Sequence, residues 1–121
     1  MTVLLVLLGG AIGAPVRYLT DVVVQSRHNS VLPWGTITVN VVGSLALGLV
    51  AGLASASTVP AWVLTLIGTG FCGALTTFST FSFETVRLAE AGRWWPAVGN
   101  VVISLAVGLL AVSVGWELGT L

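Results

Sequence analysis

Four long apolar stretches constrain this chain more than any other feature of its sequence. They cover about residues 2–24, 34–53, 61–83 and 97–116, which is most of the 121 residues. A helix needs about 20 mainly apolar residues, each rising about 1.5 Å, to cross a hydrocarbon core of about 30 Å. The sequence therefore predicts an all-α membrane protein with four transmembrane helices in a single domain, residues 1–121.

The composition leaves a water-soluble fold without enough polar surface. Hydrophobic residues make up 56% of the chain and charged residues 7%, which is too few polar side chains to cover a small globule. The net charge is zero and every basic residue is Arg, so no basic tract is available to bind nucleic acid. We therefore expect a multi-pass protein of the cell inner or plasma membrane, surrounded by the lipid bilayer.

Side chains that usually carry catalysis or bind a transition metal are scarce. His28 and Cys72 are the single residues of their kinds, so they predict neither an internal disulfide nor a zinc site. We expect His28 to be exposed or interfacial in the first loop and Cys72 to pack within a helix. The sequence therefore predicts that this protein is not an enzyme.

The charged residues are expected close to helix ends. Arg17 and Asp21 are four residues apart on the first helix, so they share a face and can pair near the membrane boundary. Glu84, Glu90 and Glu117 are expected near the ends of the third and fourth helices. A proton-coupled exporter of cationic drugs is an alternative function. Such an exporter needs a carboxylate at mid-membrane depth, whereas the glutamates of this chain are expected near helix ends.

The middle of the third stretch is unlike a lipid-facing helix. Between Gly68 and Thr80 it contains three glycines and five hydroxyl residues where Leu and Val would be expected. This composition predicts a helix that is broken near its middle. Backbone carbonyls in an unwound stretch can coordinate a cation, and Gly73 and Thr76 lie inside it. A simple kink without an ion is the alternative.

Uncharged hydrogen-bond donors and two aromatic rings remain at mid-membrane depth. Phe78 and Phe81 are three residues apart, so they share a helix face, and ring edges carry partial positive charge; ordinary core packing of the two rings is the alternative. Uncharged donors can replace the water around an anion without trapping it, as a buried Lys or Arg would. The donors in question are Asn40, Ser79, Thr80 and Ser104, with Asn100 also on the fourth helix.

Three sequence runs resemble the signature of the Fluc/CrcB fluoride channel family. They are GALTTFSTF at residues 73–81, GTITVNVVGS at residues 35–44 and GGAIGAPVRY at residues 9–18. All three runs occur in the order that the family has, in a four-helix chain of the family's length. The resemblance spans essentially the whole chain.

The resemblance implies an antiparallel, dual-topology dimer with two separate pores that conduct fluoride passively out of the cytoplasm and so reduce its toxicity. It also implies a structural sodium ion at the dimer centre, held by backbone carbonyls of both subunits. Where the family usually has a second glycine, this chain has Ala74, which adds a methyl group beside the implied sodium site. The residues at matching positions are Phe78 and Phe81 (fluoride contacts), Asn40 (pore-lining donor), Ser79 and Thr80 (polar track), Gly73 and Thr76 (sodium carbonyls), and Arg17 and Glu84 (vestibules).

Two glycine pairs leave a purely structural role open. Gly9 with Gly13 and Gly48 with Gly52 have the small-xxx-small spacing that lets membrane helices approach closely. They permit a membrane subunit that only stabilises a larger complex. That alternative does not explain the cluster of Thr, Ser and Phe residues over residues 76–81.

The arginines predict the membrane orientation. The first and third loops, about residues 25–33 and 84–96, hold Arg27, Arg87 and Arg93, whereas the second loop and the C-terminal tail hold no basic residue. Loops rich in Arg stay in the cytoplasm, so tags on both termini should be accessible only from outside. Two partners for an antiparallel dimer therefore stay open: a second copy of this chain, or an oppositely oriented paralogue, which the bias would suit. Equal accessibility of both tags on both sides of the membrane would contradict this expectation.

Overall fold

The computed structural model describes residues 1–27 and 32–121, and its regular elements are all helices. Four segments are long and apolar enough to cross a membrane, which confirms an all-α, multi-pass membrane protein. His28, expected to be exposed or interfacial, lies outside the described residues. The elements are α1 (Thr2–Arg27), α2 (Trp34–Ser55), α3 (Ala61–Val63), the π-helix η1 (Leu64–Cys72), α4 (Gly73–Leu75), α5 (Phe78–Glu90) and α6 (Trp94–Gly119).

The helices extend beyond the ends expected from the apolar stretches. The third span reaches Glu90 and the fourth begins at Trp94, so the expected third loop over residues 84–96 is wrong. Hydropathy marks where the hydrocarbon ends, whereas a helix can continue into the polar interface, where its charged side chains meet water. Pro96 does not prevent the early start of α6, because proline is tolerated in the first turn of a helix.

A glycine-dependent turn ends the third span. Gly92 has a φ of +77°, a conformation that favours glycine. The Gly92 amide donates to the carbonyl of Ala89 at 3.0 Å, and the Arg93 amide donates to the carbonyl of Leu88 at 2.8 Å. This bonding pattern is the Schellman motif, which closes a helix within a few residues. The connection between α5 and α6 is therefore tight.

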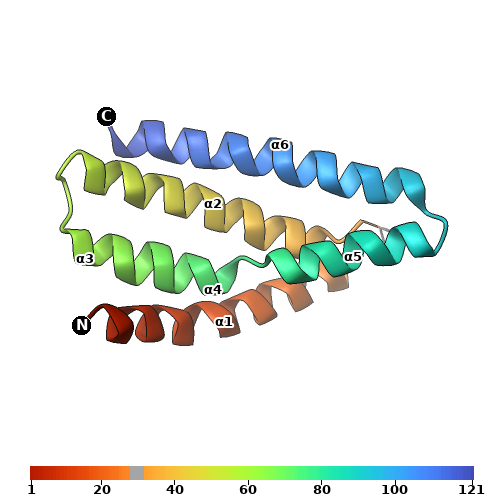
Figure 1. The fold of residues 1–121 in the computed structure, drawn as a ribbon, viewed down its shortest axis with the longest axis horizontal. Helices are drawn as coiled ribbons and strands as arrows, with labels where there is room; N and C mark the ends of the chain where they lie inside the picture. The colour runs from red at the N-terminus through yellow and green to blue at the C-terminus, as the bar shows by residue number, and fades with distance from the viewer. Residues whose placement is uncertain (28–31) are drawn as a thin grey trace.

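The spans lie in rows, in the order α6, α2, the α3–α5 span and α1 (Figure 1). α2 packs along α6 on one side and against α1 and η1 on the other, whereas α6 contacts the third span chiefly through α5. Both termini lie at the same end of the bundle (Figure 1), as an even number of spans requires. The space beside α2, between η1 and α6, is where the candidate site lies.

The third span also contains a wide helical segment that the sequence did not reveal. Residues Leu64–Cys72 form a π-helix, in which Gly68 and Gly70 are buried. π-helical segments are uncommon and often lie at functional sites. The irregular backbone of the third span therefore begins before its glycine- and hydroxyl-rich middle.

Glycines allow backbone-to-backbone contact between the long helices. A Cβ atom at Gly48 would overlap the backbone of α6, and one at Gly115 would overlap the backbone of α2. Likewise, Cβ atoms at Gly9 and Gly13 would overlap the backbone of η1. Lipid provides little hydrophobic drive for helix association, so close contacts of this kind hold membrane bundles together. The small-xxx-small pairs are thus used within the chain.

We expect Gly115→Ala to destabilise the bundle, because the new Cβ would overlap the carbonyl oxygen of Leu45. Overpacking of this kind costs about 1–3 kcal/mol. Gly99→Ala on the same helix is the matched control, since a Cβ there meets nothing within 4 Å. The measurement is the fraction of detergent-solubilised protein that stays monodisperse after heating. Equal losses in the two variants would contradict the packing.

Candidate functional site

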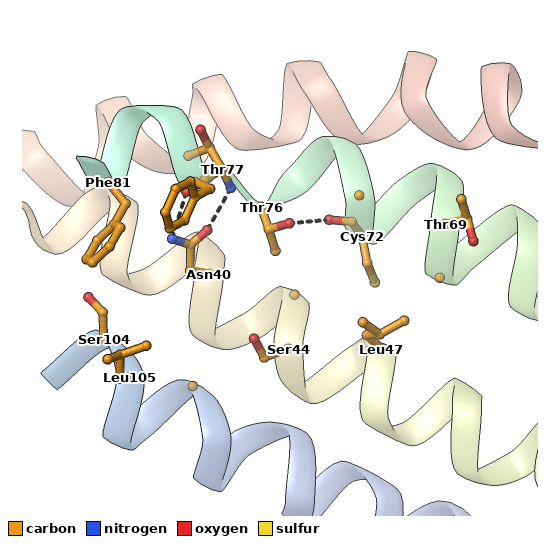
Figure 2. A pocket seen from close by; sticks show the side chains of 15 residues that line it. Asn40, Ser44, Leu47, Thr69, Cys72, Thr76, Thr77, Phe81, Ser104 and Leu105 are labelled. Atoms are coloured by element: carbon orange, nitrogen blue, oxygen red, sulfur yellow. Dashed lines mark hydrogen bonds between the residues drawn. The ribbon is translucent and has the colours of Figure 1, made fainter. Parts of the chain in front are cut away.

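A cavity of about 540 Å³ lies over one face of α2. α2 contributes its floor, η1 and α4 form one wall, and α6 forms the opposite wall. Residues from the start of α5 lie at one end (Figure 2). The lining is mainly small or apolar and includes no Lys, Arg, Asp or Glu; its principal members are Asn40, Gly43, Ser44, Cys72, Gly73, Thr76, Thr77, Phe78, Phe81 and Ser104.

The third span is interrupted beside this cavity. Thr76 and Thr77 have extended backbones, with φ/ψ of −83°/160° and −150°/124°, and they separate α4 from α5. Thr77 caps α5, since its hydroxyl oxygen accepts a hydrogen bond from the Thr80 amide at 3.2 Å. The N-terminus of α5, which is the positive end of its helix dipole, therefore lies at the cavity.

The side chain of Asn40 forms hydrogen bonds with the Thr77 backbone, which has no helical partners at the interruption. Its Nδ2 donates to the Thr77 carbonyl at 3.0 Å, and its Oδ1 accepts from the Thr77 amide at 2.8 Å (Figure 2). A primary amide has two N–H donors, so this pair uses one of them. Asn40 also lines the cavity, and its second N–H is the group that can serve a ligand there.

The two phenylalanines of α5 are in contact with each other and line the same cavity. Their ring centroids are 5.8 Å apart and the rings are tilted by 45°. Phe78 is 78% exposed, whereas Phe81 is half-buried. In Figure 2, Phe81 and Ser104 approach the cavity from α5 and α6 on facing sides. The structure thus brings Asn40, Phe78, Phe81 and Ser104 together.

Ser79 and Thr80 occupy a different position from the other predicted donors. Neither residue is part of the cavity lining. Both bond to Thr77, whose Oγ1 lies 3.4 Å from the Ser79 Oγ and 3.1 Å from the Thr80 Oγ1. Their structural contribution is therefore to support the Thr77 cap at the start of α5.

The carbonyls of Gly73 and Thr76 lose their helical donors at the interruption. In a continuous helix the Thr77 amide would donate to Gly73, but it donates to Asn40 instead. The Thr80 amide, which would donate to Thr76, donates to the Thr77 hydroxyl. Gly73 and Thr76 both line the cavity, so the two carbonyls left available by these exchanges belong to cavity residues.

Ala74 does not disturb this arrangement. Its Cβ lies 3.1 Å from the position that a Cβ at Gly13 would take and 3.8 Å from that position at Gly10. The methyl group therefore faces α1, and Ala74 is not part of the cavity lining. Ser57 is the one non-glycine residue with positive φ in the described ranges, so the backbone of Ala74 is unstrained.

Comparison with known proteins places this architecture in a family. A family model described as "CrcB-like protein, Camphor Resistance (CrcB)" matches residues 4–116. The chain belongs to the CrcB family. The match includes most or all of each of the four spans of this CrcB-family protein and confirms the resemblance seen in the three sequence runs.

Its curated relatives carry a functional name. A protein of Frankia casuarinae named "Fluoride-specific ion channel FluC 1" is 56% identical over 120 residues, covering 95% of this chain and 93% of that protein. A protein of Nocardia farcinica with the same name is 58% identical over 112 residues, covering 93% of this chain and 76% of that protein. Ion channels are not enzymes, so the prediction that this protein is not an enzyme is confirmed.

The two predicted vestibule residues lie outside the cavity lining of this CrcB-family protein. Glu84 lies inside α5, not at a helix end as we expected, and it accepts a 2.6 Å hydrogen bond from the hydroxyl of Thr36. Arg17 is half-buried on α1, and the described residues contain no ion pair between it and Asp21. The Asp21 carboxylate instead lies against Gly35, where a Cβ atom would overlap it.

Several residues that shape the site are not among those predicted from the sequence. Thr77 is one of the five hydroxyl residues between Gly68 and Thr80, yet it caps α5 and pairs with Asn40. Gly43 lines the cavity and leaves room for the methyl group of Thr76, which a Cβ at this position would overlap. Thr85 bonds to Asn100 across helices. Its position four residues after Phe81 was the available signal, because such residues share a helix face.

We expect Asn40→Leu to loosen the interruption, because it removes both bonds to the Thr77 backbone. Leaving these buried groups unpaired costs about 1–3 kcal/mol each, so amides in residues 73–80 should exchange with deuterium faster. Ser55→Ala is the control, since the Ser55 hydroxyl bonds only within α2, to the Gly52 carbonyl. Unchanged exchange over residues 73–80 in Asn40→Leu would contradict the proposed support.

Proposed function

We propose that this CrcB-family protein is a fluoride channel through which fluoride leaves the cytoplasm passively, which reduces its toxicity. The observation that carries the proposal is the cavity at the interrupted third span, where uncharged donors and aromatic rings surround a space that no Lys or Arg lines. The names of the relatives from Frankia casuarinae and Nocardia farcinica support fluoride as the ion.

Several weak attractions for an anion converge at one end of the cavity. The N-terminus of α5 contributes its partial positive charge, and Asn40 contributes an N–H that the Thr77 backbone does not use. The edges of Phe78 and Phe81 contribute further partial positive charge. Because none of these groups carries a full charge, a dehydrated anion can enter this region without being held too tightly to leave.

The Ser104 hydroxyl can exchange one acceptor for another as an ion passes. It donates to the Oδ1 of Asn100 at 3.3 Å, and it lies in the cavity lining. Rotating this hydroxyl towards an anion would replace one hydrogen bond with another, so the net change in free energy would be small. A small net gain suits a site that conducts an ion rather than storing it.

A structural sodium ion fits the Gly73 and Thr76 carbonyls. Carbonyl oxygens of unwound membrane helices are suitable ligands for sodium, and these two have lost their helical donors to Asn40 and Thr77. Two carbonyls are too few to surround an ion, so a second chain would have to contribute an equivalent pair. The described residues contain no cluster of three or more His, Cys, Asp or Glu, so backbone oxygens are the relevant ligands.

The proposed assembly is an antiparallel dimer with one pore along each chain. Arg27 is the last residue of α1 and Arg93 directly precedes α6. These two helix ends lie at the end of the bundle opposite the termini (Figure 1). The positive-inside rule therefore gives a single copy one preferred orientation. An oppositely inserted relative is the partner that fits this bias, and a second copy of the same chain is the alternative.

We expect liposomes that contain this protein to release fluoride but not chloride. Phe78→Leu and Phe81→Leu should each lower the fluoride efflux, because ring contacts of about 1 kcal/mol correspond to a change of roughly five- to tenfold. Phe83→Leu is the matched control, since Phe83 is on the same helix, is 63% exposed and does not line the cavity. A fluoride-selective electrode measures the efflux.

The same assay separates the channel from the alternatives. Chloride release equal to fluoride release would contradict fluoride selectivity. Efflux that required a proton gradient would favour coupled export, for which Glu84 within the third span would be the carboxylate to test. Unchanged efflux in Phe78→Leu and Phe81→Leu would remove these rings from the ion path. If the chain alone shows no efflux, co-reconstitution with an oppositely oriented relative tests whether a heterodimer is needed.

A further inference from the structure

α5 carries both phenylalanines of the cavity but is weakly anchored by apolar packing. None of its residues, all of which the structure describes, is buried. The interruption before Phe78 also means that continuous helical backbone does not hold its start. Side-chain hydrogen bonds connect the α5 region to neighbouring helices at Thr77, Glu84 and Thr85. The positions of the rings therefore depend strongly on these polar links.

Asn100 on α6 makes the link at Thr85. It is fully buried, with an exposed fraction of 0%. Its Nδ2 donates to the Thr85 hydroxyl oxygen at 2.8 Å, and the Thr85 hydroxyl donates to the carbonyl of Phe81 at 2.8 Å. Its Oδ1 accepts from the Ser104 hydroxyl at 3.3 Å. One buried amide thus connects the backbone of Phe81 with Ser104 on the facing wall.

The direction of these bonds explains why an amide suits this place. The only hydroxyl proton of Thr85 is used at Phe81, so Thr85 can only accept from α6. The NH₂ group of Asn100 meets that need, and its orientation then points the carbonyl oxygen towards Ser104. A carboxylate would face the Thr85 oxygen without a proton, and an aliphatic side chain would make neither bond. Of these three kinds of side chain, only an amide at residue 100 can bond to both Thr85 and Ser104.

We propose that Asn100 is a positioning residue of the ion path, which holds Phe81 through Thr85 and Ser104 directly. Asn100 is not part of the cavity lining, so it acts through these two residues and not through contact with the ion. The geometry stands on the described hydrogen bonds, while the consequence for conduction rests on the proposed fluoride channel. The expected consequence is that the network sets the spacing between the α5 and α6 sides of the cavity.

Comparing a single and a double apolar variant distinguishes an effect on the position of Phe81 from an effect on the stability of the fold. Thr85→Val removes the acceptor of a buried N–H, so it should lower both thermal stability and fluoride efflux. The double variant Thr85→Val with Asn100→Leu removes both partners, an exchange that folds tolerate much better. We expect the double variant to regain thermal stability while its efflux stays roughly tenfold below that of the natural protein, because positional coupling in a network is lost. Thr85→Ser, which keeps the hydroxyl, should retain efflux.

Thr38→Val is the matched control. The Thr38 hydroxyl makes the same type of bond within its own helix, to the Trp34 carbonyl at 2.7 Å, and among the described residues no hydrogen bond joins it to the network. Its stability and efflux should both stay close to those of the natural protein. If the double variant regains efflux together with stability, the network is only structural and the inference is wrong.

A spectroscopic measurement tests the positioning of Phe81 without measuring ion flux. 4-Fluorophenylalanine placed at residue 81 reports the environment of the ring by ¹⁹F NMR. The double variant should shift or broaden this signal, whereas Thr38→Val should not. An unchanged signal in the double variant would overturn the positioning role. If the natural protein releases no fluoride from liposomes, either alone or together with an oppositely oriented relative, the proposed function fails, while the ¹⁹F signal still decides whether Asn100 positions Phe81.

Discussion

The third span can be interrupted inside a membrane because side chains take over the bonds of its backbone. Hydrocarbon offers no water to unpaired amides, so the Thr77 amide binds Asn40 and the Thr80 amide binds the Thr77 hydroxyl. The same exchanges free the carbonyls of Gly73 and Thr76 and turn the positive end of α5 towards the cavity. The need to satisfy these hydrogen bonds therefore has two results. The helix N-terminus at the cavity suits an anion, and the freed carbonyls a few residues away suit a cation.

The cavity follows from how unevenly the spans pack. α2 and α6 approach closely through Gly48 and Gly115, while α6 meets the third span mainly through α5. The remaining space is bounded in part by residues too small to fill it, such as Gly73 and Gly108, where a Cβ atom would meet nothing closer than 3.9 Å. Small residues therefore have two effects in this protein, since they bring some helices together and leave room between others.

Much of this organisation was predictable from the sequence, for identifiable reasons. The length of an apolar stretch is set by the bilayer, so the four spans could be recognised without any tertiary information. The three-residue spacing of Phe78 and Phe81 predicts a shared face on any helix, and both rings line the cavity. The same rule could have shown that Ser79, one residue after Phe78, faces elsewhere.

Other features depended on contacts that no local pattern contains. Glu84 was expected at a helix end, because hydropathy falls there, but the turn at Gly92 sets the real end of α5. The roles of Asn100 and Thr85 require knowing that α5 and α6 lie side by side. The use of both amide groups of Asn40 requires knowing where the Thr77 backbone lies.

The orientation of Ala74 bears on how related chains can differ in sequence. Its methyl group occupies the seam between α4 and α1, opposite the hydrogen atom of Gly13. A Cβ atom at Gly13 would overlap the carbonyl oxygen of Phe71 whatever side chain stands at residue 74, so only α4 can supply a methyl group to this seam. Residue 74 can therefore alternate between Gly and Ala in related chains, whereas residue 13 should stay Gly.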